Sequence, residues 1–190
     1  MQQRRPIPLC ALIAALAAAV AGAGPFGCAR TTLTKELDTS SDAADMTRDI
    51  AFWHRLPERS AVSNNEGIHG LLVLAFDQDP TSSYDGRVKL AKEKGLLPPG
   101  FSEPGNATMT RGTLAYALAR HAGVEGGVMM RISKGSSRYA TRELVFLGIL
   151  PQGSTENQSI SGLDFVGVVS KAQDYIAVRG TGFEPLQKDR

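Results

Sequence analysis

The sequence contains very little cysteine and histidine. Cys10 and Cys28 are the only cysteines among 190 residues, so a framework of several disulfide bonds is excluded. None of the three histidines, His54, His69 and His121, stands beside a cysteine or at the spacing of a two-histidine metal site. We therefore expect no metal site and no cofactor.

The chain also lacks the short motifs that mark common catalytic and nucleotide-binding sites. It has no Gly-x-Ser-x-Gly turn, no phosphate-binding loop and no dinucleotide fingerprint. Its charge is almost balanced, with 21 Lys and Arg against 19 Asp and Glu, which provides no basic surface for nucleic acid. We expect a protein that is not an enzyme, has no catalytic residues and does not bind nucleic acid.

No apolar run reaches the length of about 20 residues that an ordinary membrane-spanning helix needs. The longest run, from Ile7 to Ala23, follows a short basic start and precedes a Gly-Pro turn. This order is typical of a secretion signal. We expect residues 1–27 to be a signal peptide and the protein to be exported, with a non-cleaved membrane anchor as the alternative.

Cys28 suggests where the signal ends. Cleavage before Cys28 discards Cys10 and leaves Cys28 as the only cysteine, at the position where bacterial lipoproteins carry their lipid. A lone thiol without a disulfide partner is unusual in an exported protein, whereas lipidation accounts for it. Acyl chains on Cys28 would hold the protein at a membrane by roughly 0.8 kcal/mol per buried CH₂. Ordinary cleavage after Ala23 is the alternative.

Both ends of the mature chain are polar. Residues 28–45 are rich in Thr, Ser, Asp and Ala, which predicts a flexible tether after the lipidated cysteine. Residues 46–180 are expected to form the folded domain. Residues 181–190 lose the helical periodicity and are expected to be a mobile tail.

A sequence pattern recurs within this domain. Residues 95–98, Gly-Leu-Leu-Pro, return 53 positions later as Gly-Ile-Leu-Pro at 148–151, and a fainter Leu56-Pro57 lies upstream. Apolar residues at helical spacing precede each Leu-Pro break, where proline makes continuation of a helix costly. The helices expected before these breaks are Asp42–His54, Ser83–Lys94 and Ser137–Leu147.

Each break is followed by a helix-start signature, an apolar residue and then a Ser or Thr that can cap the helix. These pairs are Val62-Ser63, Met109-Thr110 and Ile160-Ser161. The pattern predicts a mainly α-helical fold of three tandem helix-loop-helix repeats packed around a shared core. Leu71–Phe76 and Gly126–Ile132 have strand-like composition and leave room for minor short β segments.

The repeating units resemble S-layer homology repeats. The similarity is strongest over Gly95–Val124, which has the Gly-Leu-Leu step, a loop and the Thr110-Arg111 pair that opens the second helix. The corresponding pair is Ser161-Gly162 in the third unit and Ser63-Asn64 in the first. The resemblance implies a module that attaches to cell-wall or envelope polysaccharide, with Thr110 and Arg111 contributing to ligand grooves between units.

Phe101, in the long loop of the second unit, is the aromatic residue that we expect to be exposed and able to stack on a sugar ring. The leading hypothesis is a non-enzymatic lipoprotein of the cell envelope, at the outer membrane or periplasmic face. It would bind wall polysaccharide, peptidoglycan or another envelope protein. Two alternatives remain, a periplasmic hydrolase or enzyme accessory protein with titratable groups around His69 or Asp164, and a purely structural spacer.

Overall fold

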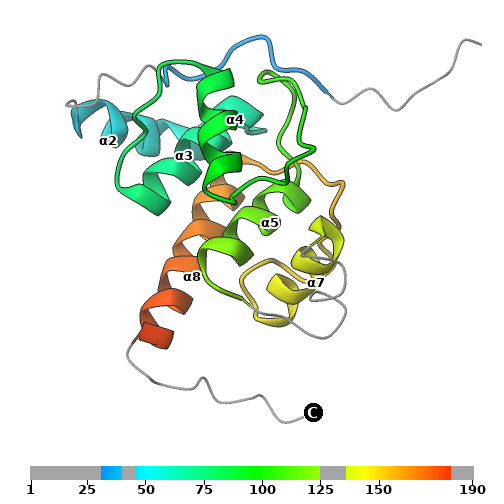
Figure 1. The fold of residues 1–190 in the computed structure, drawn as a ribbon. Helices are drawn as coiled ribbons and strands as arrows, with labels where there is room; N and C mark the ends of the chain where they lie inside the picture. Colours follow the sequence, from blue (N-terminus) through cyan, green and yellow to red (C-terminus); the bar gives the residue numbers. More distant parts are fainter. Residues whose placement is uncertain (1–30, 40–45, 125–135, 181–190) are drawn as a thin grey trace, which may run out of the picture. The chain divides into compact units, whose positions relative to one another are not determined.

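The computed structural model describes residues 31–39, 46–124 and 136–180. These residues form helices joined by loops (Figure 1), so the expectation of a mainly α-helical fold is confirmed. The elements are α2 (Met46–Arg55), η1 (Leu56–Glu58), α3 (Asn64–Phe76), α4 (Tyr84–Glu93), α5 (Arg111–His121), α7 (Ser137–Phe146) and α8 (Gly162–Gly180).

The segments with strand-like composition do not form strands in the described part of the chain. Leu71–Phe76 belongs to α3, and Gly126–Ile132 lies outside the described residues. Extended pairing within the described ranges is limited to isolated bridges, which are Thr32 with Ala107, Ser63 with Thr108, and Thr110 with Ser159. All three are antiparallel.

The helices pack in a cyclic order. Helix α3 contacts α4, α5 contacts α7, and α8 contacts η1 near the start of the domain. Here the first helix pair is α2 and α3 with η1 between them, the second is α4 and α5, and the third is α7 and α8. The second helix of each pair packs against the first helix of the next pair, and α8 packs against η1 of the first pair. Buried apolar side chains from all of these elements belong to one core cluster.

A ring of backbone hydrogen bonds joins the three helix starts. The N–H of Met109 donates to the carbonyl of Val62 at 2.8 Å, that of Val62 to Ile160 at 3.0 Å, and that of Ile160 to Met109 at 3.3 Å. All three side chains are fully buried. The apolar residues that the sequence places before each helix cap thus meet at the centre of the domain.

Each cap forms as the sequence predicts. Ser63 accepts the N–H of Glu66 at 3.0 Å, and Glu66 accepts the N–H of Ser63 at 2.8 Å, which completes a capping box. Thr110 accepts the N–H of Thr113 at 3.1 Å, and Ser161 accepts that of Asp164 at 3.1 Å. These bonds satisfy amide groups that have no partner within the first turn of a helix.

The two Gly-x-Leu-Pro segments have the same backbone geometry. The N–H of Leu96 bonds to the carbonyl of Ala91, and the N–H of Ile149 bonds to that of Leu144, 53 residues later. Gly95 and Gly148 both have φ of +74°, a left-handed conformation that glycine adopts without strain. The glycine therefore ends α4 and α7 in the same way.

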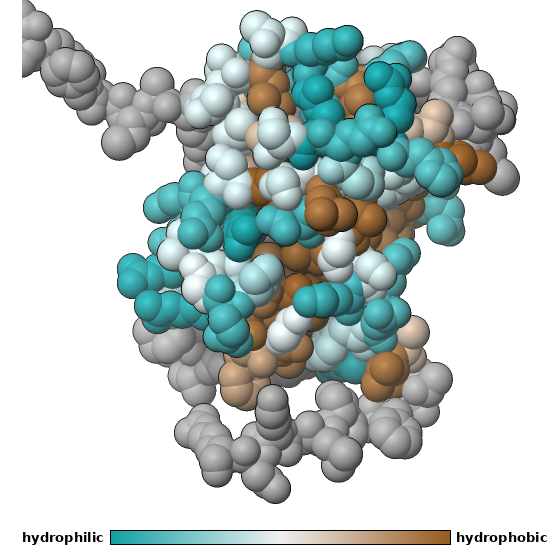
Figure 2. Space-filling model, turned by 180° about the vertical axis from the view of Figure 1, so that it is seen from behind, coloured by the Kyte–Doolittle hydropathy of each residue, from teal (hydrophilic) through white to brown (hydrophobic). Residues whose placement is uncertain are grey.

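The core lies between the helices, and some large apolar side chains remain exposed at the surface. On the face shown in Figure 2, hydrophobic surface gathers near the centre, with hydrophilic residues on either side. The most exposed large apolar side chains of the described residues are Ile50, Phe146 and Leu163. None of the described helices has both the length and the apolar character needed to cross a bilayer.

Residues 31–39, here called the strap, run along the helical domain (blue in Figure 1). The carbonyl of Thr31 accepts the N–H of Thr108 at 2.9 Å, and the N–H of Leu33 donates to the carbonyl of Asn106 at 2.8 Å. These two bonds form an antiparallel bridge in which Thr32 lies opposite Ala107.

The second half of the strap contacts α3. The N–H of Leu37 donates to Oε1 of Glu66 at 2.7 Å, and Leu37 packs against the core. The prediction of a flexible tether over residues 28–45 is therefore wrong for residues 31–39, because the backbone of this polar segment finds partners on the folded domain. The rest of that range, and the tail predicted over residues 181–190, lie outside the described residues.

Candidate functional site

The candidate site is centred on Arg111, the first residue of α5. Its backbone N–H donates to the carbonyl of Gln158 at 2.7 Å, which joins the start of α5 to the loop before α8. Asn64 makes the equivalent bond to Ala107 at 2.8 Å. Arg111 thus stands where the second and third helix pairs meet.

The guanidinium group of Arg111 contacts two polar side chains of the third helix pair. Its Nη1 donates to Oγ of Ser154 at 2.7 Å, and its Nη2 donates to Oδ2 of Asp164 at 3.0 Å. The Arg111 side chain is 17% exposed and that of Asp164 is 43% exposed. Arg111 is therefore a partly buried residue that is held by the third helix pair.

The Nε of Arg111 is buried and has no hydrogen-bond partner among the described residues. Most buried donors in folded proteins are paired, so the unpaired Nε of Arg111 is an unusual feature of this site. A guanidinium group held by Ser154 and Asp164 is suited to bind hydroxyl or carboxylate oxygens.

Thr110 and Phe101 are the other two residues that we expected to contact a ligand. Both are buried. Thr110 is 5% exposed, and its hydroxyl is used to cap α5 and contacts Oγ1 of Thr113. Phe101 is 8% exposed and belongs to the core cluster. The prediction of an exposed Phe101 is wrong because its loop folds back onto the core, which buries the ring.

The third helix start has glycine where the second has Arg111, and the structure gives the reason. A Cβ atom at Gly162 would lie 1.7 Å from the backbone oxygen of Leu56. Any side chain at this position would require η1 to move. The Thr-Arg pair is therefore incompatible with the close contact between α8 and η1.

Cys28, the residue expected to carry the lipid, lies outside the described residues. The three residues after position 30 already belong to the docked strap, with Thr31 bonded to Thr108. Lipidation of Cys28 remains a prediction from the sequence.

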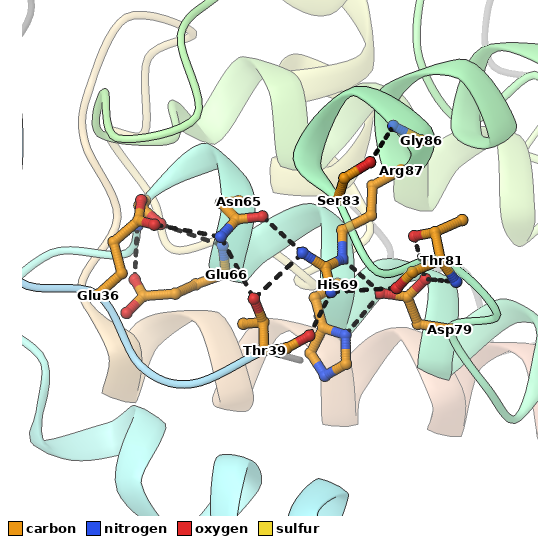
Figure 3. Close-up of polar contacts among 11 residues, drawn as sticks. Glu36, Thr39, Asn65, Glu66, His69, Asp79, Thr81, Ser83, Gly86 and Arg87 are labelled. Carbon is orange, nitrogen blue, oxygen red and sulfur yellow. Dashed lines mark hydrogen bonds and ion pairs between the residues drawn. The ribbon is translucent and has the colours of Figure 1, made fainter. Parts of the chain in front are cut away.

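A second polar cluster surrounds Arg87 on α4 (Figure 3). The Arg87 side chain is buried, and its Nε lies 2.5 Å from Oδ2 of Asp79. Its Nη1 donates to Oδ1 of Asn65 at 2.8 Å and to Oγ1 of Thr39 at 3.1 Å, while Nη2 donates to the carbonyl of Thr39. Arg87, on α4, therefore links Thr39 at the end of the strap to Asn65 at the start of α3 by hydrogen bonds.

Asp79 is held in its charged form by this cluster. Burial alone would raise the pKa of its carboxyl group, but hydrogen bonds from His69, Thr81 and Arg87, together with the positive charge of Arg87, lower the pKa to about 2. Oδ2 lies 2.8 Å from Nδ1 of His69, and Oδ1 accepts both the N–H and the hydroxyl of Thr81. Both oxygens of Asp79 are thus engaged within the protein.

His69, one of the two centres considered for an enzymatic site, is almost completely buried. It is 2% exposed, and its ring makes an edge contact with Phe52, with the ring centroids 4.7 Å apart. Its Nδ1 lies within hydrogen-bonding distance of the carboxylate of Asp79. This geometry is that of a buried structural pair and gives a substrate no direct access.

Sequence reasoning did not identify the Arg87 cluster. Arg87 and Asp79 lie eight residues apart across a loop, and Thr39 lies 48 residues from Arg87. The one local signal was Ser83, which accepts the N–H of Gly86 and fixes the start of α4. No group of at least three metal-ligating side chains is found in the described ranges.

Comparison with known proteins gives no relative. No protein-family model, no curated protein and no solved structure matches the chain.

Proposed function

We propose that this chain is a non-enzymatic lipoprotein of the cell envelope whose helical module binds wall polysaccharide or peptidoglycan through the region of Arg111. The observation that carries the proposal is the geometry of Arg111, Ser154 and Asp164, which join the second and third helix pairs at a partly exposed point. The resemblance of the Gly95–Val124 segment to S-layer homology repeats supports the same assignment.

The chemistry of the site favours an oxygen-rich ligand. Nη1 and Nη2 of Arg111 are engaged by Ser154 and Asp164, and the buried Nε has no partner among the described residues. Saccharide hydroxyl groups exchange readily with such protein donors and acceptors, and a sugar carboxylate would form a charge-assisted bond. A carboxylate group of a wall polymer would compete with Asp164 for Nη2 of Arg111.

The membrane anchor in the proposal is the lipidated Cys28. Support comes from the basic start, apolar run and lone cysteine of the sequence. Intact-mass analysis of the protein purified from its host tests the anchor directly. A chain that starts at Cys28 and carries added lipid mass is expected, whereas an unmodified chain that starts at Gly24 contradicts the anchor.

Co-sedimentation with purified cell-wall sacculi tests the binding function. The wild-type domain is expected to sediment with the sacculi, and Arg111→Ala is expected to remain in the supernatant. Arg120→Ala is the matched control, because Arg120 lies at the other end of α5 and is exposed. It should sediment like the wild type.

Each variant is checked by circular dichroism and thermal unfolding, so that loss of binding is not confused with loss of fold. If the wild-type domain does not sediment, or if Arg111→Ala sediments as well as the wild type, the proposed binding site is wrong.

A further inference from the structure

The strap is an extended segment of the chain that pairs with the backbone of the helical domain. It pairs with residues 106–108, the segment just before the cap of α5. The N–H of Thr108 and the carbonyl of Asn106 form the two hydrogen bonds to the strap. Ala107 and Thr108, which lie under it, are only 2% and 3% exposed.

The segment before α8 has the same backbone geometry. The N–H of Ala107 bonds to the carbonyl of Pro104 at 3.2 Å, and the N–H of Gln158 bonds to that of Thr155 at 3.3 Å, 51 residues later. The bonds to the neighbouring helix start also correspond. The carbonyl of Ala107 accepts the N–H of Asn64, and the carbonyl of Gln158 accepts the N–H of Arg111. Residues 157–159 are therefore the counterpart of residues 106–108.

The bridge geometry fixes where the backbone groups of Ser159 point. Ser159 lies opposite Thr110 in an antiparallel bridge whose hydrogen bonds are made by the flanking residues, Arg111 to Gln158 and Ile160 to Met109. In such a pair the N–H and C=O of the central residues point away from each other. The N–H of Ser159 thus points to the outer side of its segment, as the N–H of Thr108 points toward the strap.

This second edge is uncovered. Asn157, Gln158 and Ser159 are exposed, in contrast to Ala107 and Thr108. Within the described ranges, no hydrogen bond is made by the N–H of Ser159 or the carbonyl of Asn157. The domain therefore has two backbone edges of corresponding geometry, of which the strap covers one.

We infer that residues 157–159 form a docking edge for an extended peptide segment of a partner protein, which pairs with the backbone of Asn157 and Ser159 as Thr31–Leu33 pairs with the first edge. Strand addition to an exposed backbone edge is a common mode of peptide recognition. The partner segment has the chemistry of the three strap residues that pair with the equivalent edge, Thr31-Thr32-Leu33, which are uncharged and include two threonines.

This inference does not depend on saccharide binding. The saccharide site uses the side chain of Arg111, whereas the docking edge uses backbone groups of residues 157–159. Failure of one is therefore distinguishable from failure of the other, since Arg111→Ala leaves the backbone of the edge unchanged.

The test is a titration of the full, isotope-labelled protein with a synthetic peptide of residues 31–37, followed by NMR. The amide signal of Ser159 is expected to shift, and its hydrogen exchange is expected to slow. Ser159→Pro removes the donor and should weaken peptide binding by about fivefold or more. Ser159→Ala is the matched control, because it removes the hydroxyl group and keeps the N–H, and it should bind like the wild type.

Modified peptides test the same edge without changing the protein. A peptide N-methylated at Leu33 loses the N–H that would reach the carbonyl of Asn157, and it should bind about fivefold or more weakly. A peptide N-methylated at Thr32 is the control, since that N–H points away from the edge.

Three outcomes would overturn the inference. The first is absence of any shift at Ser159 with the peptide at millimolar concentration. The second is a set of shifts confined to residues 106–108, which would mean that the peptide only replaces the strap. The third is a dimer in analytical ultracentrifugation that Ser159→Pro dissociates, which would assign the edge to a second copy of the chain.

Discussion

Nε of Arg87 lies 2.5 Å from Oδ2 of Asp79, and both side chains are almost completely buried. The same guanidinium group holds the backbone and the hydroxyl of Thr39 at the end of the strap. This one cation therefore connects the loop before α4, the start of α3 and the strap. The stability of this part of the domain should depend on it strongly.

Replacement of Arg87 by Met is expected to lower the free energy of unfolding by about 3–5 kcal/mol, because the charge of Asp79 would remain buried without its partner. Urea denaturation measures this change. The control is Arg120→Met on the exposed end of α5, where a change within about 0.5 kcal/mol is expected. A loss below about 1 kcal/mol for the Arg87 variant would show that the ion pair is dispensable.

The lowered pKa of Asp79 predicts a specific loss of stability in acid. The pKa of Asp79 falls from 3.8 to about 2 on folding, so the folded state binds a proton less readily than the unfolded state. The corresponding stability, about 2 kcal/mol, is fully present above the ordinary pKa and is lost as the pH falls through the folded pKa. The difference in unfolding free energy between the wild type and Asp79→Asn should therefore shrink between about pH 4 and pH 2. A difference that stays constant over this range would contradict the assignment.

Two glycines of α8 should respond oppositely to alanine. At Gly162 an added Cβ would lie 1.7 Å from the backbone oxygen of Leu56, and displacement of η1 should cost about 1–3 kcal/mol. At Gly167 an added Cβ meets no heavy atom within 4 Å, and alanine should stabilise the helix by about 0.5–1 kcal/mol. Thermal unfolding of Gly162→Ala and Gly167→Ala measures both changes in stability. Equal effects at the two positions would mean that α8 does not pack against η1 as described.

If the proposed saccharide site is correct, removal of the competing carboxylate of Asp164 should increase the affinity for a carboxylated polymer. Asp164→Asn weakens the hold on Nη2 of Arg111, so binding of a wall polymer that bears carboxylate groups should tighten by about two- to fivefold. Binding is measured by calorimetry with carboxylated and carboxyl-reduced forms of the same polymer. The reduced polymer should show no gain. Weaker binding of the carboxylated form to Asp164→Asn would assign Asp164 a direct role in binding.

The helix starts were predictable because their signals are local. A cap needs a Ser or Thr side chain within reach of an amide three residues later, and Ser63 with Glu66 or Thr110 with Thr113 meets this condition within one turn. The ends of α4 and α7 were predictable for the same reason, since Gly95 and Gly148 lie next to the Leu-Pro breaks. Arg111 was singled out by the resemblance of the Thr110-Arg111 pair to S-layer homology repeats.

The strap and Phe101 were predicted wrongly because burial depends on distant residues. The polar composition of residues 31–39 resembles that of a tether, but its backbone groups bond to Asn106 and Thr108, more than 70 residues away in sequence. Phe101 lies in a polar loop, yet the loop turns the ring into the core. Neither result follows from the neighbours of these residues in the chain.

The sequence by itself determined the helical class, the caps and the breaks, because each depends on contacts within a few residues. Only the tertiary structure decided how these elements close on one another. The ring of Val62, Met109 and Ile160 brings together three distant parts of the sequence, and the bonds of Arg87 to Thr39 require the strap to be in place. The free edge at residues 157–159 also exists only through this arrangement, since the strap covers one edge of the domain and leaves its counterpart exposed.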